Sequence, residues 1–224
     1  MAALRETTAS RLTSEFVGTG FLLLSVVGSG IMAERLSPND VGLQLLENSM
    51  ATAGALLCLI LLFGATSGAH FNPAVTLWAR LAGDLDNRMA GLYVVVQTAG
   101  AILGVIAANV IFELDAVFWS TNDRISGAAF LSEIIATFGL VIVIIGVVRS
   151  GKAQFVPFAV AAYIGGAYFF TSSTSFANPA VTVGRMFSDT FAGIAPASAP
   201  LFIVAQFIGA LCAIGVARVT HPQR

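Results

Sequence analysis

Charged residues are scarce in this sequence. Asp, Glu, Lys and Arg make up 10% of its 224 residues, whereas an average soluble domain has about 25%. Hydrophobic residues make up 57%, and a water-soluble fold with so few charges would expose apolar patches large enough to cause aggregation. The net charge is −1 and no basic patch is evident, so we expect no nucleic acid partner. The composition predicts a protein that resides in a lipid bilayer.

Cysteine and histidine are also scarce, at two residues each. Cys58 and Cys212 both lie inside apolar runs, so we expect small packed residues that form neither a disulfide nor a metal site. The histidines are His70 and His221, and the sequence contains no Gly-x-Ser-x-Gly motif and no His-rich helix. An intramembrane enzyme would need a nucleophile and a base, or a metal cluster. We therefore predict no catalytic residue, no metal and no cofactor.

Long apolar segments are abundant. A transmembrane helix needs about 20 apolar residues, and six segments qualify: 12–34, 41–63, 89–111, 128–149, 155–171 and 199–218. With six spans, both termini lie on the same side as the second and fourth connecting loops. That side carries eight of the eleven basic residues, namely Arg5, Arg11, Arg80, Arg88, Arg149, Lys152, Arg218 and Arg224. The positive-inside rule then predicts an inner (plasma) membrane protein with both termini in the cytoplasm.

The sequence contains an internal duplication in three ordered parts. Ser14-Glu15-Phe16 recurs as Ser132-Glu133-Ile134, Asn-Pro-Ala-Val-Thr occurs at 72–76 and 178–182, and the segment 96–101 resembles 205–210. Each copy holds three spans, which is an odd number, so the second copy enters the membrane from the opposite side. We predict a single all-α membrane domain over residues 1–224, with six transmembrane helices and two half-helices in an inverted repeat of about 1–115 and 125–224.

The half-helices follow from the two Asn-Pro-Ala turns, Asn72-Pro73-Ala74 and Asn178-Pro179-Ala180. Asn is a good N-cap, and Pro is favourable at the first helical position because its missing N–H would be unpaired there. Each turn precedes a short apolar run, to about Ala82 and Phe187 respectively. Ten helical residues rise about 15 Å, or half a bilayer. Inverted symmetry therefore brings the two N-termini together near the membrane midplane.

That arrangement predicts how a pore would select its solutes. Each half-helix presents the positive end of its dipole, about half a charge, to the midplane, so cations and hydronium ions are repelled while neutral solutes pass. The amide N–H groups of Asn72 and Asn178 then orient a passing water oxygen and interrupt the chain of donors along which protons would move. The sequence predicts a passive channel for water or small neutral solutes.

On these motifs the sequence resembles the major intrinsic protein (aquaporin and aquaglyceroporin) family over essentially its whole length, most closely in the segment from Ser67 to Thr76. The resemblance implies a homotetramer with one pore per subunit. It also implies that Glu15 and Glu133 brace the pore loops from within the membrane; the alternative is a pair of acids that reach out from the helix ends. His70 is interpreted as a loop-packing residue near the cytoplasmic mouth, or else a pH-sensitive one.

The predicted selectivity filter differs from that of most family members, where Arg follows the second Asn-Pro-Ala. Here Val181 has that position, and counting back from the two Asn residues carries the other filter positions to small, uncharged residues: Thr52, Gly166 and Ser175. The predicted constriction is wide and lacks a fixed cation. Arg185 lies one helical turn beyond Val181. It either reaches back into the outer vestibule or pairs with Asp189 at i+4, and the spacing is compatible with both.

The segment 171–182, with Val in place of Arg, is similar to a bacterial aquaporin subgroup linked to arsenic-resistance operons. That resemblance suggests arsenous acid, urea or glycerol-like polyols as permeants beside water. The alternative is a secondary transporter, because inverted repeats with broken helices also build those. Coupled carriers usually place ionisable groups at the midplane, whereas Glu15 and Glu133 lie near the ends of their spans. The sequence favours the channel.

Overall fold

The computed structural model describes residues 7–222, so Arg5 and Arg224, which contribute to the charge asymmetry above, lie outside the described residues. The described part of the chain is helical. Its α-helices are α1 (Thr8–Leu36), α2 (Val41–Ser67), α3 (Pro73–Ala82), α4 (Asn87–Ile111), α5 (Gly127–Arg149), α6 (Val156–Phe170), α7 (Pro179–Gly184) and α8 (Ala199–Thr220). Two 3₁₀ turns, Ala153–Phe155 and Arg185–Phe187, precede α6 and follow α7.

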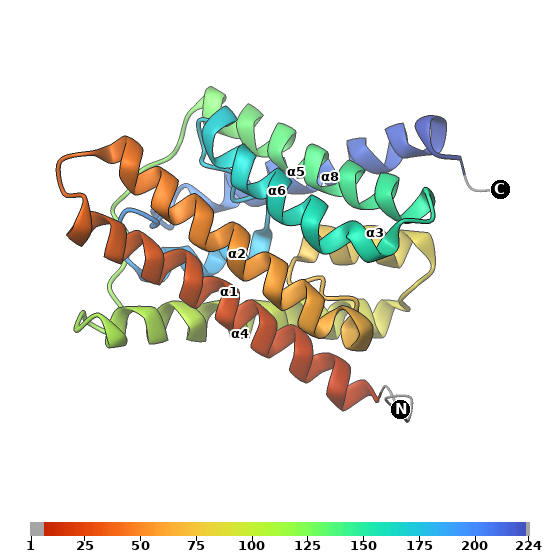
Figure 1. Cartoon of the computed structure of the whole chain (residues 1–224), viewed down its shortest axis with the longest axis horizontal. Coiled ribbons are helices and arrows are strands. Elements are labelled where there is room, and N and C mark those ends of the chain that lie inside the picture. Colours follow the sequence, from red (N-terminus) through yellow and green to blue (C-terminus); the bar gives the residue numbers. More distant parts are fainter. Residues whose placement is uncertain (1–6, 223–224) are drawn as a thin grey trace.

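Six helical segments are long and apolar enough to cross a membrane, and they correspond to the six predicted spans. The fifth span joins the 3₁₀ turn to α6, over Ala153–Phe170. The predicted fold class is confirmed. α1 begins and α8 ends at the same end of the bundle, as an even number of spans requires (Figure 1).

Local sequence signals explain where most of the long helices start. Side chains of Thr7, Asp40, Asp86 and Ser126 accept hydrogen bonds from backbone N–H groups in the first turns of α1, α2, α4 and α5, respectively. Such caps satisfy N–H groups that have no partner within the helix, each stabilising it by about 1 kcal/mol. The helix boundaries are therefore set by short polar residues at the ends of apolar runs.

The inverted repeat is visible in the packing of the long helices. α1 packs most extensively against α4, and α5 packs against α8 in the same way. Both pairs approach closely at a glycine: a Cβ atom on Gly100 would lie 2.3 Å from the Phe16 carbonyl oxygen, and one on Gly209 would lie 2.4 Å from the Ile134 carbonyl oxygen. These two contacts occupy corresponding places in the two copies of the sequence. Small residues thus allow the backbones of each pair to touch.

The two cysteines do not lie where they were expected. Cys58 and Cys212 are free thiols, as predicted, but both are exposed on the outer surface of the bundle and not packed within it. The reason is that lipid is as apolar as a protein interior, so an apolar run does not reveal which of its residues face inward.

The two half-helices fill the space between the long helices. α3 packs against α4, α8 and α5, whereas the shorter α7 packs against α4 and α8, and α3 and α7 also contact each other. Each begins at the proline of an Asn-Pro-Ala turn, as the sequence predicts. This fold therefore brings two segments that are about a hundred residues apart to one place inside the bundle.

We expect Gly209→Ala to lower the thermal unfolding temperature of the detergent-solubilised protein. The added Cβ would collide with backbone in α5, and overpacking of this kind typically costs about 1–3 kcal/mol. Gly215→Ala on the same helix is the matched control, because nothing lies within 4 Å of its added Cβ. Equal unfolding temperatures for the two variants would show that the close contact between α5 and α8 is not needed.

Candidate functional site

The two loops that precede the half-helices share an unusual backbone conformation. In the first loop φ is positive at Gly68 (87°), Ala69 (49°) and Phe71 (49°); in the second it is positive at Thr174 (63°), Ser175 (52°) and Ala177 (48°). Positive φ at residues other than glycine is uncommon and costs free energy unless the surroundings hold it in place. The loops therefore need partners that fix their backbone.

Glu15 of α1 is the partner of the first loop. One carboxylate oxygen accepts hydrogen bonds from the Ser67 hydroxyl (2.7 Å) and the His70 backbone N–H (2.9 Å). The other accepts from the Phe71 backbone N–H (2.7 Å) and the Gln97 side-chain amide (2.8 Å). Glu15 is fully buried, so it does not reach out from the helix end. Its carboxylate joins α1, α4 and the loop.

Glu133 of α5 has the same position in the second copy. Its carboxylate accepts hydrogen bonds from the backbone N–H groups of Phe176 and Ala177 (both 2.9 Å) and from the Gln206 side-chain amide (2.6 Å). It is also fully buried. The two loops are thus held by matching sets of donors and acceptors, although their side chains differ.

Asn72 and Asn178 connect the two loops to each other. The side-chain oxygen of each caps its own half-helix, accepting from the Ala74 N–H (2.9 Å) in one case and from the Ala180 N–H (3.0 Å) in the other. The amide nitrogen of Asn72 donates to the Ala177 carbonyl oxygen, and that of Asn178 donates to the Phe71 carbonyl oxygen, both at 2.8 Å. Each amide has two N–H groups, so one remains for the space that both residues line.

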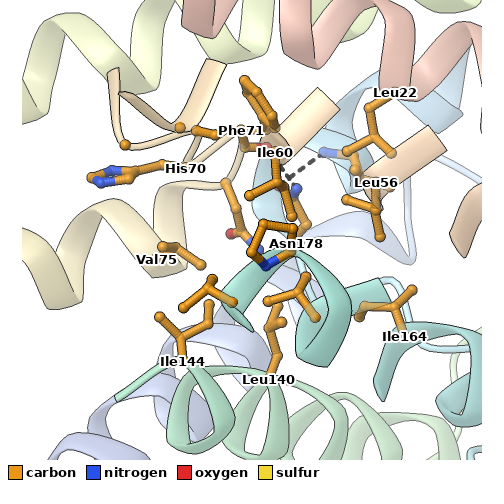
Figure 2. A pocket seen from close by; sticks show the side chains of 18 of the residues that line it. Leu22, Leu56, Ile60, His70, Phe71, Val75, Leu140, Ile144, Ile164 and Asn178 are labelled. Atoms are coloured by element: carbon orange, nitrogen blue, oxygen red, sulfur yellow. Dashed lines mark hydrogen bonds between the residues drawn. The ribbon is translucent and has the colours of Figure 1, made fainter. Parts of the chain in front are cut away.

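That space is a cavity of about 380 Å³. It is bounded at one end by Asp84, just after α3, and at the other by Arg185, just after α7, with both asparagines on its wall. Aliphatic side chains line most of it and surround Asn178, including Leu22, Leu56, Ile60, Val75, Leu140, Ile144 and Ile164 (Figure 2). An apolar wall interrupted by a few polar groups suits a small polar solute that must pass without being held tightly.

Three of the four predicted filter residues line this cavity, namely Thr52, Ser175 and Val181. Gly166 does not; it is exposed on the outward side of α6, and Tyr168 faces the cavity in its place. Two residues correspond to about 200° of helix rotation, so a count along the chain that misses by two selects the opposite face. The helical period that relates Ile164 to Tyr168, four residues apart on one face, was the signal that could have identified Tyr168.

Tyr168 also corrects the expectation that small residues alone surround the outer constriction. Its hydroxyl is 3.0 Å from the Thr52 hydroxyl, a hydrogen bond that joins α6 to α2 across this end of the cavity. The side chain is almost fully buried. This end of the cavity therefore includes a large aromatic residue.

Arg185 lies beside the same constriction, and its two predicted placements can now be distinguished. It is 1% exposed, its Nε donates to the Ala192 carbonyl oxygen, and its guanidinium carbon lies 3.4 Å from the centre of the Phe176 ring. Asp189 accepts instead from the backbone N–H (2.8 Å) and hydroxyl of Thr121. The i+4 pairing is therefore wrong, and this end of the cavity is lined by a buried arginine.

The loops near Arg185 supply uncharged hydrogen-bond donors to their own acidic side chains. Asp123 accepts from the Ile125 backbone N–H (2.9 Å) and the Ser198 hydroxyl (2.8 Å), and these hydrogen bonds lower the pKa of its carboxyl. Arg124 donates to the Gly193 carbonyl oxygen (2.8 Å), and its guanidinium lies 5.2 Å from the Phe176 ring centre. Two arginines thus flank one aromatic ring while the nearby Asp123 carboxylate binds other groups.

His70 lies on the cavity wall in the first loop, and in Figure 2 its ring points away from the cluster around Asn178. Its Nδ1 is 3.1 Å from the Thr76 hydroxyl, and its ring meets Tyr93 edge to face at 5.3 Å. These contacts are those of a packing residue. Within residues 7–222 we find no cluster of three His, Cys, Asp or Glu side chains that could hold a metal ion.

Comparison with known proteins gives consistent matches. The family model of the major intrinsic protein matches residues 3–175. The chain is 46% identical to the aquaglyceroporin AqpS of Rhizobium meliloti (strain 1021), over 93% of this chain and 88% of that protein. It is 30% identical to aquaporin Z of Brucella melitensis biotype 1, over 90% and 93% respectively. The X-ray structure of the aquaglyceroporin from Plasmodium falciparum has the same fold, with a TM-score of 0.73 at 22% identity, covering 94% and 96% of the two chains.

We expect Glu133→Gln to lower both the thermal stability and the water permeability, the latter by about tenfold. A glutamine offers one oxygen and turns an N–H group toward backbone donors, and a buried donor without an acceptor costs about 1–3 kcal/mol. Stopped-flow light scattering on proteoliposomes and a thermal unfolding assay would measure the two effects.

Glu47→Gln is the control for that variant. Glu47 accepts from the Ser37 hydroxyl near the turn that joins α1 to α2, and within residues 7–222 it makes no hydrogen bond to either pore loop, so its substitution should change neither property. Wild-type stability and flux in Glu133→Gln would contradict a role for this carboxylate in holding the loop.

Proposed function

The chain belongs to the major intrinsic protein family, as a passive membrane channel for water and small solutes and not an enzyme, and on this premise we propose that solutes cross through the cavity between its two Asn-Pro-Ala turns. The observation that carries the proposal is a pair of hydrogen bonds between the two loops at the wall of that cavity, from the Asn72 amide to the Ala177 carbonyl oxygen and from the Asn178 amide to the Phe71 carbonyl oxygen. It joins the N-termini of the two half-helices at one point of the passage.

We propose that this point excludes ions and protons. Two half-helix N-termini, each with about half a positive charge, oppose any cation that approaches it. The remaining amide N–H groups of Asn72 and Asn178 donate to the oxygen of a water molecule that passes. That water then directs its own hydrogens away from both asparagines, so the file of water molecules has no continuous direction along which protons can hop.

We propose water and small neutral solutes, such as glycerol-like polyols, urea or arsenous acid, as the permeants. The relative AqpS is called an aquaglyceroporin, and the filter position occupied by Arg in most family members is Val181 here. The proposed filter consists of Thr52, Tyr168, Ser175, Val181 and Arg185, which all line one end of the cavity. A carrier would need a free carboxylate for a coupling ion, whereas the carboxylates of Glu15 and Glu133 already bind the loops.

The protein resides in the plasma membrane, and for its arrangement there we propose two cytoplasmic termini and a homotetramer with one passage per subunit. The excess of basic residues at the end where α1 begins supports the orientation. We also propose that the chain is one domain of two inverted repeats, 1–115 and 125–224. The matched contacts of Glu15 and Glu133 support that division.

The proposed passage can be tested with Val181→Arg. In proteoliposomes of the wild-type protein we expect water and at least one of glycerol, urea and arsenous acid to cross faster than through protein-free vesicles. The variant places a long cation beside Arg185 in the constriction, so we expect flux of the larger solutes to fall about tenfold or more while some water flow remains. Stopped-flow measurements of each solute would show the change.

Val181→Leu separates the effect of charge from that of size. It adds volume at the same place without a cation, so its effect on the larger solutes should be smaller. If Val181→Arg kept the wild-type permeability for every solute, the passage would not run beside residue 181.

A further inference from the structure

A second cavity, of about 280 Å³, lies at the end of the bundle where α1 begins and α8 ends (Figure 1). Three helices that pack against one another terminate beside it, and they contribute Trp78 and Leu81 (α3), Arg149 (α5), and Ile214 and Arg218 (α8). A water molecule takes up about 30 Å³ in the liquid, so this cavity has room for a larger group. We call it the basic pocket.

Two arginines give the basic pocket its charge. Arg149 is the last residue of α5, and its Nη1 donates to the carbonyl oxygens of Ala217 (3.1 Å) and His221 (2.7 Å) near the end of α8. Its Nε and Nη2 make no hydrogen bond within residues 7–222, and the buried atoms that lack a partner do not include them, so both are accessible. Arg218 is exposed and makes neither a hydrogen bond nor an ion pair in the described part of the chain. None of the described residues that line the pocket is acidic.

The helix ends beside the pocket account for one of these arginines but not for both. Each helix C-terminus carries about half a negative charge, which a nearby cation stabilises. Carbonyl groups in the last turns of α3 and α5 already accept from backbone N–H groups of the turns that follow, and two near the end of α8 accept from Arg149. Arg218 donates to none of them. The guanidinium of Arg218 and two nitrogen atoms of Arg149 are therefore available to a ligand.

The inverted repeat shows that the fold does not require a charged cavity at such a place. By the offsets that relate α1 to α5 and α4 to α8, Arg149 corresponds to Ile31 and Arg218 corresponds to Asn109. Ile31 and Asn109 are buried, at 3% and 0% exposure, and the Asn109 amide donates to the Phe187 carbonyl oxygen (2.9 Å). Apolar and neutral side chains thus fill the corresponding place at the other end of the bundle. The two charges occur at one end alone.

Two guanidinium groups on neighbouring helices suit a ligand with several anionic oxygen atoms. The planar donors of arginine match the geometry of phosphate oxygens and form charge-assisted hydrogen bonds with them. Arg149 and Arg218 also stand at the ends of membrane spans, which is the level of the phospholipid headgroups. We propose that the basic pocket binds a phosphate group, either as free phosphate or in the headgroup of an anionic phospholipid. This site is separate from the constriction and does not depend on which solutes permeate.

Trp78 connects the basic pocket to the central cavity. It lines both of them, and Val148, which precedes Arg149, lines the central cavity as well. A group bound in the pocket therefore changes the surroundings of the Trp78 indole. The other tryptophan of the sequence, Trp119, lies in the loop between α4 and α5 at the opposite end, where its ring centre is 4.6 Å from that of Phe187. The fluorescence of Trp78 can thus report whether the pocket is occupied.

The test is a fluorescence titration of the detergent-solubilised Trp119→Phe protein, in which Trp78 is the remaining tryptophan. The probes are inorganic phosphate, the anionic short-chain lipid dihexanoyl-phosphatidylglycerol and its zwitterionic counterpart dihexanoyl-phosphatidylcholine, all at one ionic strength. We expect a saturable change in Trp78 emission with at least one of the two anionic probes. Saturation by inorganic phosphate would identify the free ion as a sufficient ligand. Saturation by phosphatidylglycerol alone would identify the anionic lipid headgroup.

Arg218→Gln in the same background should weaken binding of the anionic probe about tenfold, because a hydrogen bond from a charged donor is lost. Arg218 is exposed and has no partner within residues 7–222, so this change leaves the fold intact. Arg88→Gln is the matched control. Arg88 is an exposed arginine at the start of α4, at the same end of the bundle, but it does not line the pocket. Its substitution should leave the affinity unchanged.

Three outcomes would overturn the site. The first is the lack of a saturable response to either anionic probe. The second is an equal response to phosphatidylcholine, which would show that net negative charge is not recognised. The third is an equal loss of affinity in Arg218→Gln and Arg88→Gln, which would show attraction to the general positive charge of this end. The titration measures binding and not flux, so failure of the site would leave the proposed passage standing, and a protein that conducts nothing would leave the site standing.

Discussion

Everything at the centre of this molecule depends on two buried carboxylates that accept hydrogen bonds from strained loops. Left-handed backbone at Ala69, Phe71, Ser175 and Ala177 is unfavourable by itself, and it persists because Glu15 and Glu133 bind the N–H groups that it exposes. Once the loops are fixed, the asparagines that follow them can cap α3 and α7, and each can donate to a backbone carbonyl of the opposite loop. The two carboxylates are thus buried away from water, and their hydrogen bonds fix the geometry of the passage.

Features that depend on periodicity and end signals could be predicted from the sequence. The six spans follow from apolar length, and the starts of α3 and α7 follow from Asn-Pro, because capping and fixed φ are local properties of these residues. The inverted repeat follows from an odd number of spans per copy. Each of these inferences needs only the identity of neighbouring residues or the number of spans.

Features that depend on how one element is rotated or how a loop returns could not be predicted in this way. Gly166 was expected in the constriction from a count back from Asn178, yet α6 turns Tyr168 inward; that count crosses the loop after α6, so it does not follow the helical period that relates Tyr168 to Ile164. The placement of Arg185 depends on Phe176 and on the carbonyl of Ala192, which only the folded loops bring together. Spacing left two placements open for this arginine, in the outer vestibule or paired with Asp189, and it could not distinguish between them.

The hydrogen bonds between the loops also set an order of assembly during synthesis. The Phe71 carbonyl accepts from Asn178, and the Asn72 amide donates to Ala177. These two groups in the first loop therefore have no partner from the second loop until more than a hundred further residues have been made. Until then the first loop is bound by the Glu15 carboxylate but lacks its hydrogen-bond partners in the second loop. If synthesis stopped before Ala177, the first half of the chain would be inserted and helical but would enclose no passage. The passage forms only when the second loop and α7 have also been made.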